Sequence, residues 1–541
     1  MRPQTIPHQL NAANLISNIE QGLYCLPHFQ RDYVWQVPAA AALVDSILRG
    51  YPIGSLILWH TREELRDIRN LGNIDLPRPA PGTDRNYVLD GQQRLTSLFA
   101  ALKGLTVTLA DGRTHDFSDI WVDLAHDDDG DICAVDISNR DAERCIRLKD
   151  LYAGDVIEVA ERLPRDVRKT FGQYREALAS YLVPYVQLLN APVSAATDVF
   201  TRVNVGGKPL TVFEVMVAKT YDPERDFDLG EKWSDLIGRF SQVDFDTVDP
   251  VSVLHLAAAI LVQDVRKTRI LNLSKRDFID IWSAVEASLK SAVDFVRQQG
   301  GMRLSRLMPY TSLLVPLAYF FHLKNNKPAS ADEAEQLIAY LYGAGWAGRF
   351  TGPLETVLNQ DCTAMKRLVE SGRLKVDFEV RINADDLIDA EFRAGSAFSK
   401  TIMAVLARQN PRAFDNHNHQ VDLDNSTMQA ANSKNFHHFF PKAFLKNNGV
   451  PPGISENSVV NITLVDAWLN KAKIKARAPS DYMAEFRSAS RFLQSAATHF
   501  IDAGPDSPIW RDDYAAFLAD RAARIAQELE RLTAPLTAVR D

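Results

Sequence analysis

The hydrophobic pattern of the chain changes twice, and this feature constrains the fold most. Up to about residue 225, short apolar runs that suit β-strands alternate with stretches at helical spacing. From 226 to 404 the apolar residues fall almost entirely at helical spacing, whereas 405–541 begins with a polar segment rich in Asn and His. The sequence therefore predicts a multidomain α+β protein with three parts, 1–225, 226–404 and 405–541.

Composition narrows the class of protein. Of the 541 residues, 46% are hydrophobic and 24% charged, which excludes a disordered chain, a collagen-like fibre and a disulfide scaffold. The 61 basic and 69 acidic residues give a formal charge of −8, so a globally basic nucleic-acid coat is excluded, although a local basic patch is not. The four cysteines include no C-x-x-C pair, no signal-peptide pattern opens the chain, and the apolar stretch 312–323 is too short to cross a bilayer. We expect a cytoplasmic protein with no membrane partner.

A cluster of His and Asn residues lies near the C-terminus. The phrase FHHFFPKAFL places His437 and His438 at the end of a short predicted strand. A loop follows, then a predicted strand with Asn461 and a predicted helix with Asn470. Folding this hairpin onto the helix brings the His pair and Asn470 together. Phosphodiester hydrolysis needs a general base for water and a divalent cation for the phosphate, and these side chains supply both functions.

These four residues resemble the HNH (ββα-metal) endonuclease motif in its His-His-x-Phe-Pro variant. The resemblance implies that His438 is the general base, that His437 and Asn470 bind the metal, and that Asn461 holds the loop and orients the base. The nine-residue step from Asn461 to Asn470 is also usual in that family. A His replaces the commoner Asp as first ligand, and imidazole accepts Mn, Ni or Zn as well as Mg. We expect Mg or Mn.

Other interpretations of this region remain open. The adjacent His residues also suit a helix cap or a satisfied core pair. Asp466 lies four residues before Asn470, where it suits either a metal ligand or a helix N-cap. The literal string HNH at 417–419 lies in a polar loop with no strand before it, so we expect His417 and His419 to face solvent.

Basic residues gather around the motif. Residues 430–478 contain seven Lys or Arg against only Glu456 and Asp466. This local excess suits contact with a phosphate backbone, and we expect Lys442, Lys471 and Lys473 to touch DNA. A solvated helix face explains Lys471 and Lys475 almost as well.

A second cluster lies in the N-terminal part. The phrase DGQQRLTSL, 90–98, stands where a predicted strand meets a predicted helix, so Gly91 and the first-turn amides can form an anion site. Gln92 and Gln93 can donate amide hydrogens, and Arg94 can grip phosphate in a fork. Two further phrases supply polar residues for the same cleft, namely Gln30 and Arg31 in LPHFQRDYVWQ and Asn204 in FTRVNVGGKPLTVFE.

Together these three phrases resemble the N-terminal domain of GmrSD-type type IV restriction enzymes, over roughly residues 5–225. That domain is similar to the ParB/sulfiredoxin fold, which related proteins use to bind and hydrolyse nucleotides. The resemblance implies that Asp90, Gln92, Gln93 and Arg94 touch nucleotide phosphates or a metal, and that Gln30 and Arg31 line the cleft. No Walker-type G-x-x-x-x-G-K-[ST] is present, so any NTPase activity must use another geometry. The segment RFTGPLETVLNQD, 349–361, also resembles a recurrent segment of these proteins.

The combined pattern implies an anti-phage DNA endonuclease regulated by a nucleoside triphosphate, GTP or another, that attacks invading and modified DNA. It comprises a ParB-like sensor, a helical connector and an HNH domain set within helices. One alternative is an abortive-infection toxin that cuts RNA or unmodified DNA, and another is a non-catalytic ParB-like DNA-binding protein. The sequence leaves a homo-oligomer or a partner protein from a defence system open.

Overall fold

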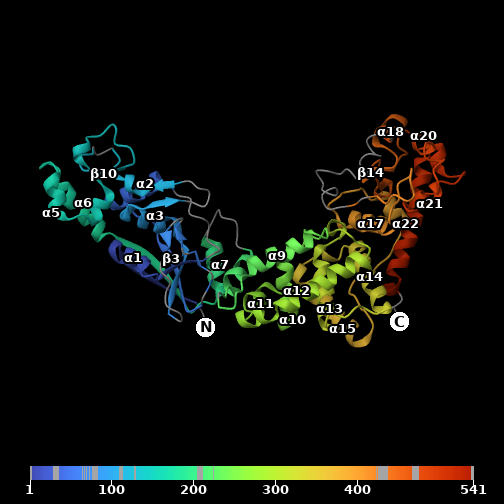
Figure 1. The fold of residues 1–541 in the computed structure, drawn as a ribbon, viewed down its shortest axis with the longest axis horizontal. Coiled ribbons are helices and arrows are strands. Elements are labelled where there is room, and N and C mark those ends of the chain that lie inside the picture. Colours follow the sequence, from blue (N-terminus) through green and yellow to red (C-terminus); the bar gives the residue numbers. More distant parts are fainter. Residues whose placement is uncertain are drawn as a thin grey trace. The chain divides into compact units, whose positions relative to one another are not determined.

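The computed structural model shows two compact units, Met1–Leu229 and Gly230–Asp541 (Figure 1). The structure describes residues 3–27, 36–63, 65, 67–68, 70–71, 74–75, 83–108, 114–126, 130–203, 211–222, 224–421, 423, 436–465, 474 and 476–537. Both units mix helices and strands, so the predicted multidomain α+β class is confirmed at this level. None of the described helices is long and apolar enough to span a bilayer.

A six-stranded mixed sheet forms the centre of the first unit. The strand order is β1-β13-β3-β7-β2-β4, with parallel pairs at β13/β3 and β2/β7 and antiparallel pairs elsewhere. The strands are β1 (Gln4–Asn11), β2 (Tyr24–Pro27), β3 (Leu56–Thr61), β4 (Asp67–Ile68), β7 (Arg85–Asp90) and β13 (Leu182–Leu189). Short pairs complete the unit: β5 (Asn70–Leu71) with β6 (Ile74–Asp75), β8 (Thr106–Thr108) with β9 (Thr114–Asp116), and β10 (Trp121–Asp123) between β11 (Cys133–Ala134) and β12 (Cys145–Arg147).

Helices cover both faces of this sheet. Alternation along the strands sends Leu58 and Val88 into a core with the apolar faces of the first helices, while Trp59 and Tyr87 face the other side. On that other side β7 contacts α7, and Trp59 donates its Nε1 hydrogen to the carbonyl of Ala191 at 3.0 Å. The helices are α1 (Ala12–Glu20), α2 (Val37–Leu48), α3 (Gln92–Lys103), α4 (Leu148–Ala153), α5 (Val156–Arg162), α6 (Arg168–Ser180), α7 (Val193–Val203) and α8 (Val212–Thr220).

The second unit is mainly helical. Its helices are α9 (Leu229–Ser241), α10 (Val251–Val262), α11 (Lys267–Leu271), α12 (Lys275–Gln298), α13 (Leu314–Leu323), α14 (Ala331–Trp346), α15 (Leu354–Ser371), α16 (Ala384–Asp389), α17 (Ala397–Arg408), α18 (Lys442–Asn448), α20 (Pro479–Ala484), α21 (Phe492–Ala497) and α22 (Tyr514–Thr537). A two-stranded hairpin of β14 (Phe436–His438) and β15 (Ile462–Leu464) lies among them. The C-terminal helix α22 packs against α14, α16 and α17, so helices from the middle of the chain and from its end share one core.

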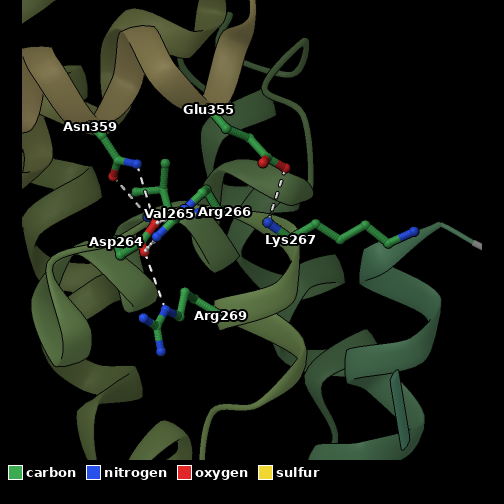
Figure 2. A network of polar contacts seen from close by, with 7 residues as sticks. All are labelled: Asp264, Val265, Arg266, Lys267, Arg269, Glu355 and Asn359. Atoms are coloured by element: carbon green, nitrogen blue, oxygen red, sulfur yellow. Dashed lines mark hydrogen bonds and ion pairs between the residues drawn. The ribbon is translucent and has the colours of Figure 1, made fainter. Parts of the chain in front are cut away.

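Polar side chains of the segment 349–361 take part in two networks of hydrogen bonds and ion pairs. Arg349 forms a buried ion pair with Asp361 at 2.8 Å, and Tyr340 of α14 donates its hydroxyl to the same carboxylate at 2.6 Å. Figure 2 shows the other network, in which Asn359 accepts from the backbone of Val265 and Asp264 accepts from arginine side chains. The residues of this second network are Asp264, Val265, Arg266, Lys267, Arg269, Glu355 and Asn359. The segment thus fastens α15 to α14 and to the loop after α10.

All four cysteines are free and buried: Cys25, Cys133, Cys145 and Cys362. Burial raises the pKa of each of the last three thiols, that of Cys145 to about 11. A protonated, enclosed thiol is a poor nucleophile, so these cysteines act as small apolar core residues.

Candidate active site and nucleotide motif

The β14–β15 hairpin carries the two histidines that the sequence analysis singled out. Phe436 pairs with Leu464, His437 with Thr463 and His438 with Ile462. The predicted strand around Asn461 is shorter than expected, because Val459–Asn461 forms a 3-10 turn and β15 begins only at Ile462. Asn461 therefore stands at the entrance to the strand and not within it.

Asn461 holds the turn that follows β14. Its side chain is fully buried, its Oδ1 accepts from the backbone N–H of Phe440 at 2.8 Å, and its Nδ2 donates to the carbonyls of Phe440 and Glu456. Its own carbonyl accepts from the N–H of Phe439. One carboxamide thus satisfies three backbone groups from both arms of the loop, and this fixes the chain directly after His438.

His438 is oriented by a residue that the sequence analysis missed. Its Nε2 lies 2.9 Å from Oδ1 of Asn457, whose Nδ2 donates to the carbonyl of Phe392 at 3.0 Å. Because that carbonyl can only accept, the amide of Asn457 must present its oxygen to His438, and the proton of the neutral imidazole lies on Nε2. Nδ1 is then the basic nitrogen. No sequence pattern marks Asn457, which stands in a polar loop.

Burial lowers the pKa of His438 below its ordinary value. The bond to Asn457 and the charge of Glu456 oppose this effect, whereas the nearby ammonium of Lys442 adds to it. The imidazole is therefore neutral at neutral pH, the state that a general base requires.

His437 has a different environment. Neighbouring residues of a strand point to opposite faces, so the pairing register places His437 on the face of Thr463 and His438 on the other. His437 is only 5% exposed. Thr463 is bonded at 2.8 Å to Nδ1 of His499, whose Nε2 lies 2.8 Å from the carbonyl of Arg412. The hairpin by itself does not bring both imidazoles to one point.

The donor set for a metal is incomplete within the described residues, where no group of three His, Cys, Asp or Glu side chains could hold an ion. Asn470 and Asp466, the candidate ligands from the predicted helix, lie outside them, as do Lys471 and Lys473. The predicted metal site at this hairpin therefore depends on residues that the structure does not describe. Asn470 remains the predicted one.

Some basic residues around the motif are paired with carboxylates, so the net positive charge is smaller than the count of Lys and Arg predicts. Arg477 is paired with Asp481 at 2.8 Å and with Glu485 at 2.6 Å, and Lys446 lies 3.8 Å from Glu456. Lys442 is half-buried at the start of α18. Part of the predicted basic excess around the motif is thus neutralised within the fold.

The literal HNH string is not part of the hairpin. His419 is exposed, as expected. The expectation for His417 was wrong, because it is half-buried and its Nδ1 lies 3.1 Å from the hydroxyl of Ser495.

In the first unit, the DGQQR phrase spans the end of β7 and the start of α3. Gly91 has φ +89° and, as the N-cap residue, has no side chain that could cap the helix. A Cβ on Gly91 would lie 2.3 Å from Cδ2 of Leu56, so only glycine allows this approach of the helix to β3. Gln92 is buried and Gln93 half-buried in the first turn.

Arg94 is engaged by the protein itself. Its guanidinium donates to the carbonyls of Ile53 and Ser55 at 2.8 and 3.1 Å and to Asp90 at 3.0 Å. It also fills the space where Gly54 would carry a side chain. A phosphate would have to use the remaining N–H groups. Gln30, Arg31 and Asn204, which were expected to line the same cleft, lie outside the described residues.

Comparison with known proteins finds similarity in the first unit and along most of the chain. Residues 12–221 match the family described as GmrSD restriction endonuclease, N-terminal domain. The chain is also 23% identical, over 88% of its own length and 86% of the other, to uncharacterized protein MJ0686 of Methanocaldococcus jannaschii.

Proposed function

We propose that this chain is a defence endonuclease that hydrolyses phosphodiester bonds of invading, modified DNA at the β14–β15 hairpin, under control of a nucleotide bound by the N-terminal unit. The observation that carries the proposal is the His438–Asn457 pair beside the loop held by Asn461. A restriction-family N-terminal domain on the same chain supports it.

His438 acts as the general base. Asn457 holds the Nε2 proton, so Nδ1 takes the proton from the attacking water. Asn461 keeps the chain after His438 in place, and Lys442, the first residue of α18, adds positive charge near the imidazole. His437 and Asn470 would hold a divalent cation, Mg or Mn, whose charge stabilises the phosphate as negative charge develops.

The nucleotide is assigned to the start of α3. Gly91 brings the backbone of the helix close to the sheet, Asp90 and Arg94 brace the turn, and the first turn with Gln92 and Gln93 suits phosphate oxygens. Gln30, Arg31 and Asn204 are the further predicted contacts. Nucleotide binding or hydrolysis at this site would switch on DNA cleavage. Such control would protect the host, because unregulated cleavage damages its own DNA.

A cleavage matrix tests the nuclease. Modified DNA, plain DNA and RNA are each combined with single metals and single nucleotides. Loss of a general base costs about 10²–10⁴ in rate, so His438→Ala should abolish measurable cleavage, whereas the exposed His419→Ala should not. Equal cleavage by both variants would contradict the proposal. Preference for RNA would favour the toxin alternative.

The control by nucleotide needs its own variant, because Arg94→Ala would also disturb the loop at Ile53–Ser55. Gln93→Ala leaves that bracing untouched. We expect it to weaken nucleotide binding and to remove the nucleotide dependence of cleavage, while metal-dependent cleavage itself survives. Unchanged nucleotide binding would contradict the assignment.

A further inference from the structure

A basic cleft lies in the helical part of the second unit, formed by the end of α12, the loop that follows it and the end of α17. Its volume is about 780 Å³. Three arginines and three carboxamides line it, with no carboxylate among the lining residues: Arg297, Arg303, Arg408, Gln298, Gln299 and Asn410. Neither the family match, which ends at residue 221, nor the nuclease motif assigns any role to these residues.

The three arginines lack acidic partners, since none of them forms an ion pair with another described residue. Arg408 donates to the carbonyl of Gln299 at 2.6 Å and Arg303 to Oδ1 of Asn410 at 2.7 Å, so both guanidinium groups are held by neutral acceptors. The Nε of Arg297 is buried and has no hydrogen-bond partner in the described part of the chain. Three uncompensated charges in one cleft of a chain with net charge −8 call for an anionic ligand.

The same elements continue towards the candidate active site. A smaller cleft, of about 150 Å³, is lined by Arg306 from the loop after α12, by Lys400 of α17, and by Phe436 of β14. Phe436 is two residues from His438 on the same strand, so the two side chains share a face. Along α17, Lys400 and Arg408 are eight residues apart, or about 12 Å. A DNA strand carries one phosphate per roughly 3.4 Å of axis, so this span matches three to four phosphates.

We propose that Arg297, Arg303, Arg408, Arg306 and Lys400 form a track that binds the backbone of the DNA strand leading to His438. The inference rests on the proposed nuclease function and adds where the substrate lies. Arginine forks fit phosphate oxygens bidentately, and the carboxamides donate to the same oxygens. The contacts are to the backbone, so they secure the strand without reading its sequence.

Binding and cleavage are tested separately in the full-length chain. DNA affinity is measured against salt concentration in the His438→Ala background, so that cleavage does not interfere. The double variant Arg297→Gln/Arg303→Gln should lower affinity at least about tenfold at low salt and reduce the log–log salt slope by about 2. The matched control Arg276→Gln/Arg381→Gln removes two exposed arginines that lie outside the cleft, and it should change affinity less than about twofold.

Four further measurements decide the outcome. Arg408→Lys keeps the charge and should retain most of the affinity, while thermal unfolding shows that each variant is folded. Unchanged binding by the double variant, or an equal loss in the control, would overturn the track. Loss of free nucleotide binding with intact DNA binding would assign the cleft to a small phosphate ligand and would also overturn it. Normal cleavage by His438→Ala in an otherwise wild-type chain would instead defeat the nuclease proposal and leave the binding result standing.

Discussion

Single carboxamides decide the geometry around His438. Asn461 joins the two arms of the loop, and Asn457 fixes the tautomer of the imidazole through a carbonyl of a distant segment. Both side chains hydrogen-bond to backbone groups, in which an N–H can only donate and a carbonyl can only accept. Each amide therefore has one possible orientation, and the arrangement is rigid. A side chain of the same size without those donors and acceptors would leave buried backbone groups unsatisfied.

The tautomer gives a test at this scale. Asn457→Ala removes the acceptor for the Nε2 proton, so we expect kcat to fall by about 10²-fold or more while KM changes little, because the substrate contacts remain. Asn457→Asp restores an acceptor oxygen but loses the donor to the carbonyl of Phe392, so it should recover only part of the rate. Steady-state kinetics of both variants measure this. An equal loss in the two would show that Asn457 has only a structural role.

Two short elements, the start of α3 and the β14–β15 hairpin, each depend on a few specific residues. The start of α3 depends on Gly91, whose positive φ and missing side chain let the helix approach Leu56 of β3. The β14–β15 hairpin depends on long-range bonds, since Thr463 is tied to His499 and His499 to the carbonyl of Arg412. Each element is therefore sensitive at one or two positions.

Gly91→Ala tests the first of these elements. A Cβ would meet Leu56 Cδ2 at 2.3 Å in a left-handed backbone conformation, so we expect a loss of about 3 kcal/mol in the free energy of unfolding. Gly172→Ala, in the middle of α6 with no atom within 4 Å, is the matched control and should stabilise by up to about 1 kcal/mol. Denaturant unfolding measures both. A harmless Gly91→Ala would contradict the close approach.

The link through His499 predicts a dependence on pH. Burial lowers the pKa of His499 from 6.5 to about 4, so the folded chain resists the proton that the unfolded chain accepts. The stabilisation is fully present above about pH 6.5 and is lost as pH falls towards 4, by about 3 kcal/mol for this one group. His499→Gln should unfold with a shallower pH dependence over that window. The same slope in both proteins would contradict the assignment. Buried His255 shifts in the same direction but is common to both.

The whole molecule consists of two units, each with its own core. The predicted helical middle and C-terminal part share helices at one core, through α22 against α14 and α17. If the first unit senses the nucleotide and the second unit cleaves DNA, only the intact chain can show nucleotide-dependent cleavage.

Residues 230–541 produced alone should therefore fold. We expect a helical circular dichroism spectrum and one cooperative thermal transition, since the core of this unit is internal to it. The fragment should also cut DNA regardless of nucleotide. Absence of a cooperative transition would contradict the independence of the unit, and cleavage by the fragment that still requires nucleotide would contradict control from the N-terminal unit.

Much of this could be predicted from the sequence, and the failures have physical causes. The strands at 85–90 and 182–189 and the helix from residue 92 are encoded locally, by apolar runs and by glycines at the helix boundaries. The role of Asn457 is not encoded locally, because it depends on Phe392, sixty-five residues away. Likewise, an arginine after a glycine turn suggests a phosphate grip, whereas the carbonyls that engage Arg94 come from a loop forty residues earlier.

The burial of all four thiols has a practical consequence. Cys25, Cys133, Cys145 and Cys362 should stay unmodified when native protein meets a maleimide dye, and all four should react once the chain is unfolded. A single cysteine introduced at an exposed site, such as Gln298→Cys at the rim of the basic cleft, would then be the only fast-labelling position. Mass spectrometry of labelled native protein checks the silent background. The Gln298→Cys chain, labelled at that position, becomes a fluorescent reporter of DNA arrival without any natural cysteine having to be removed.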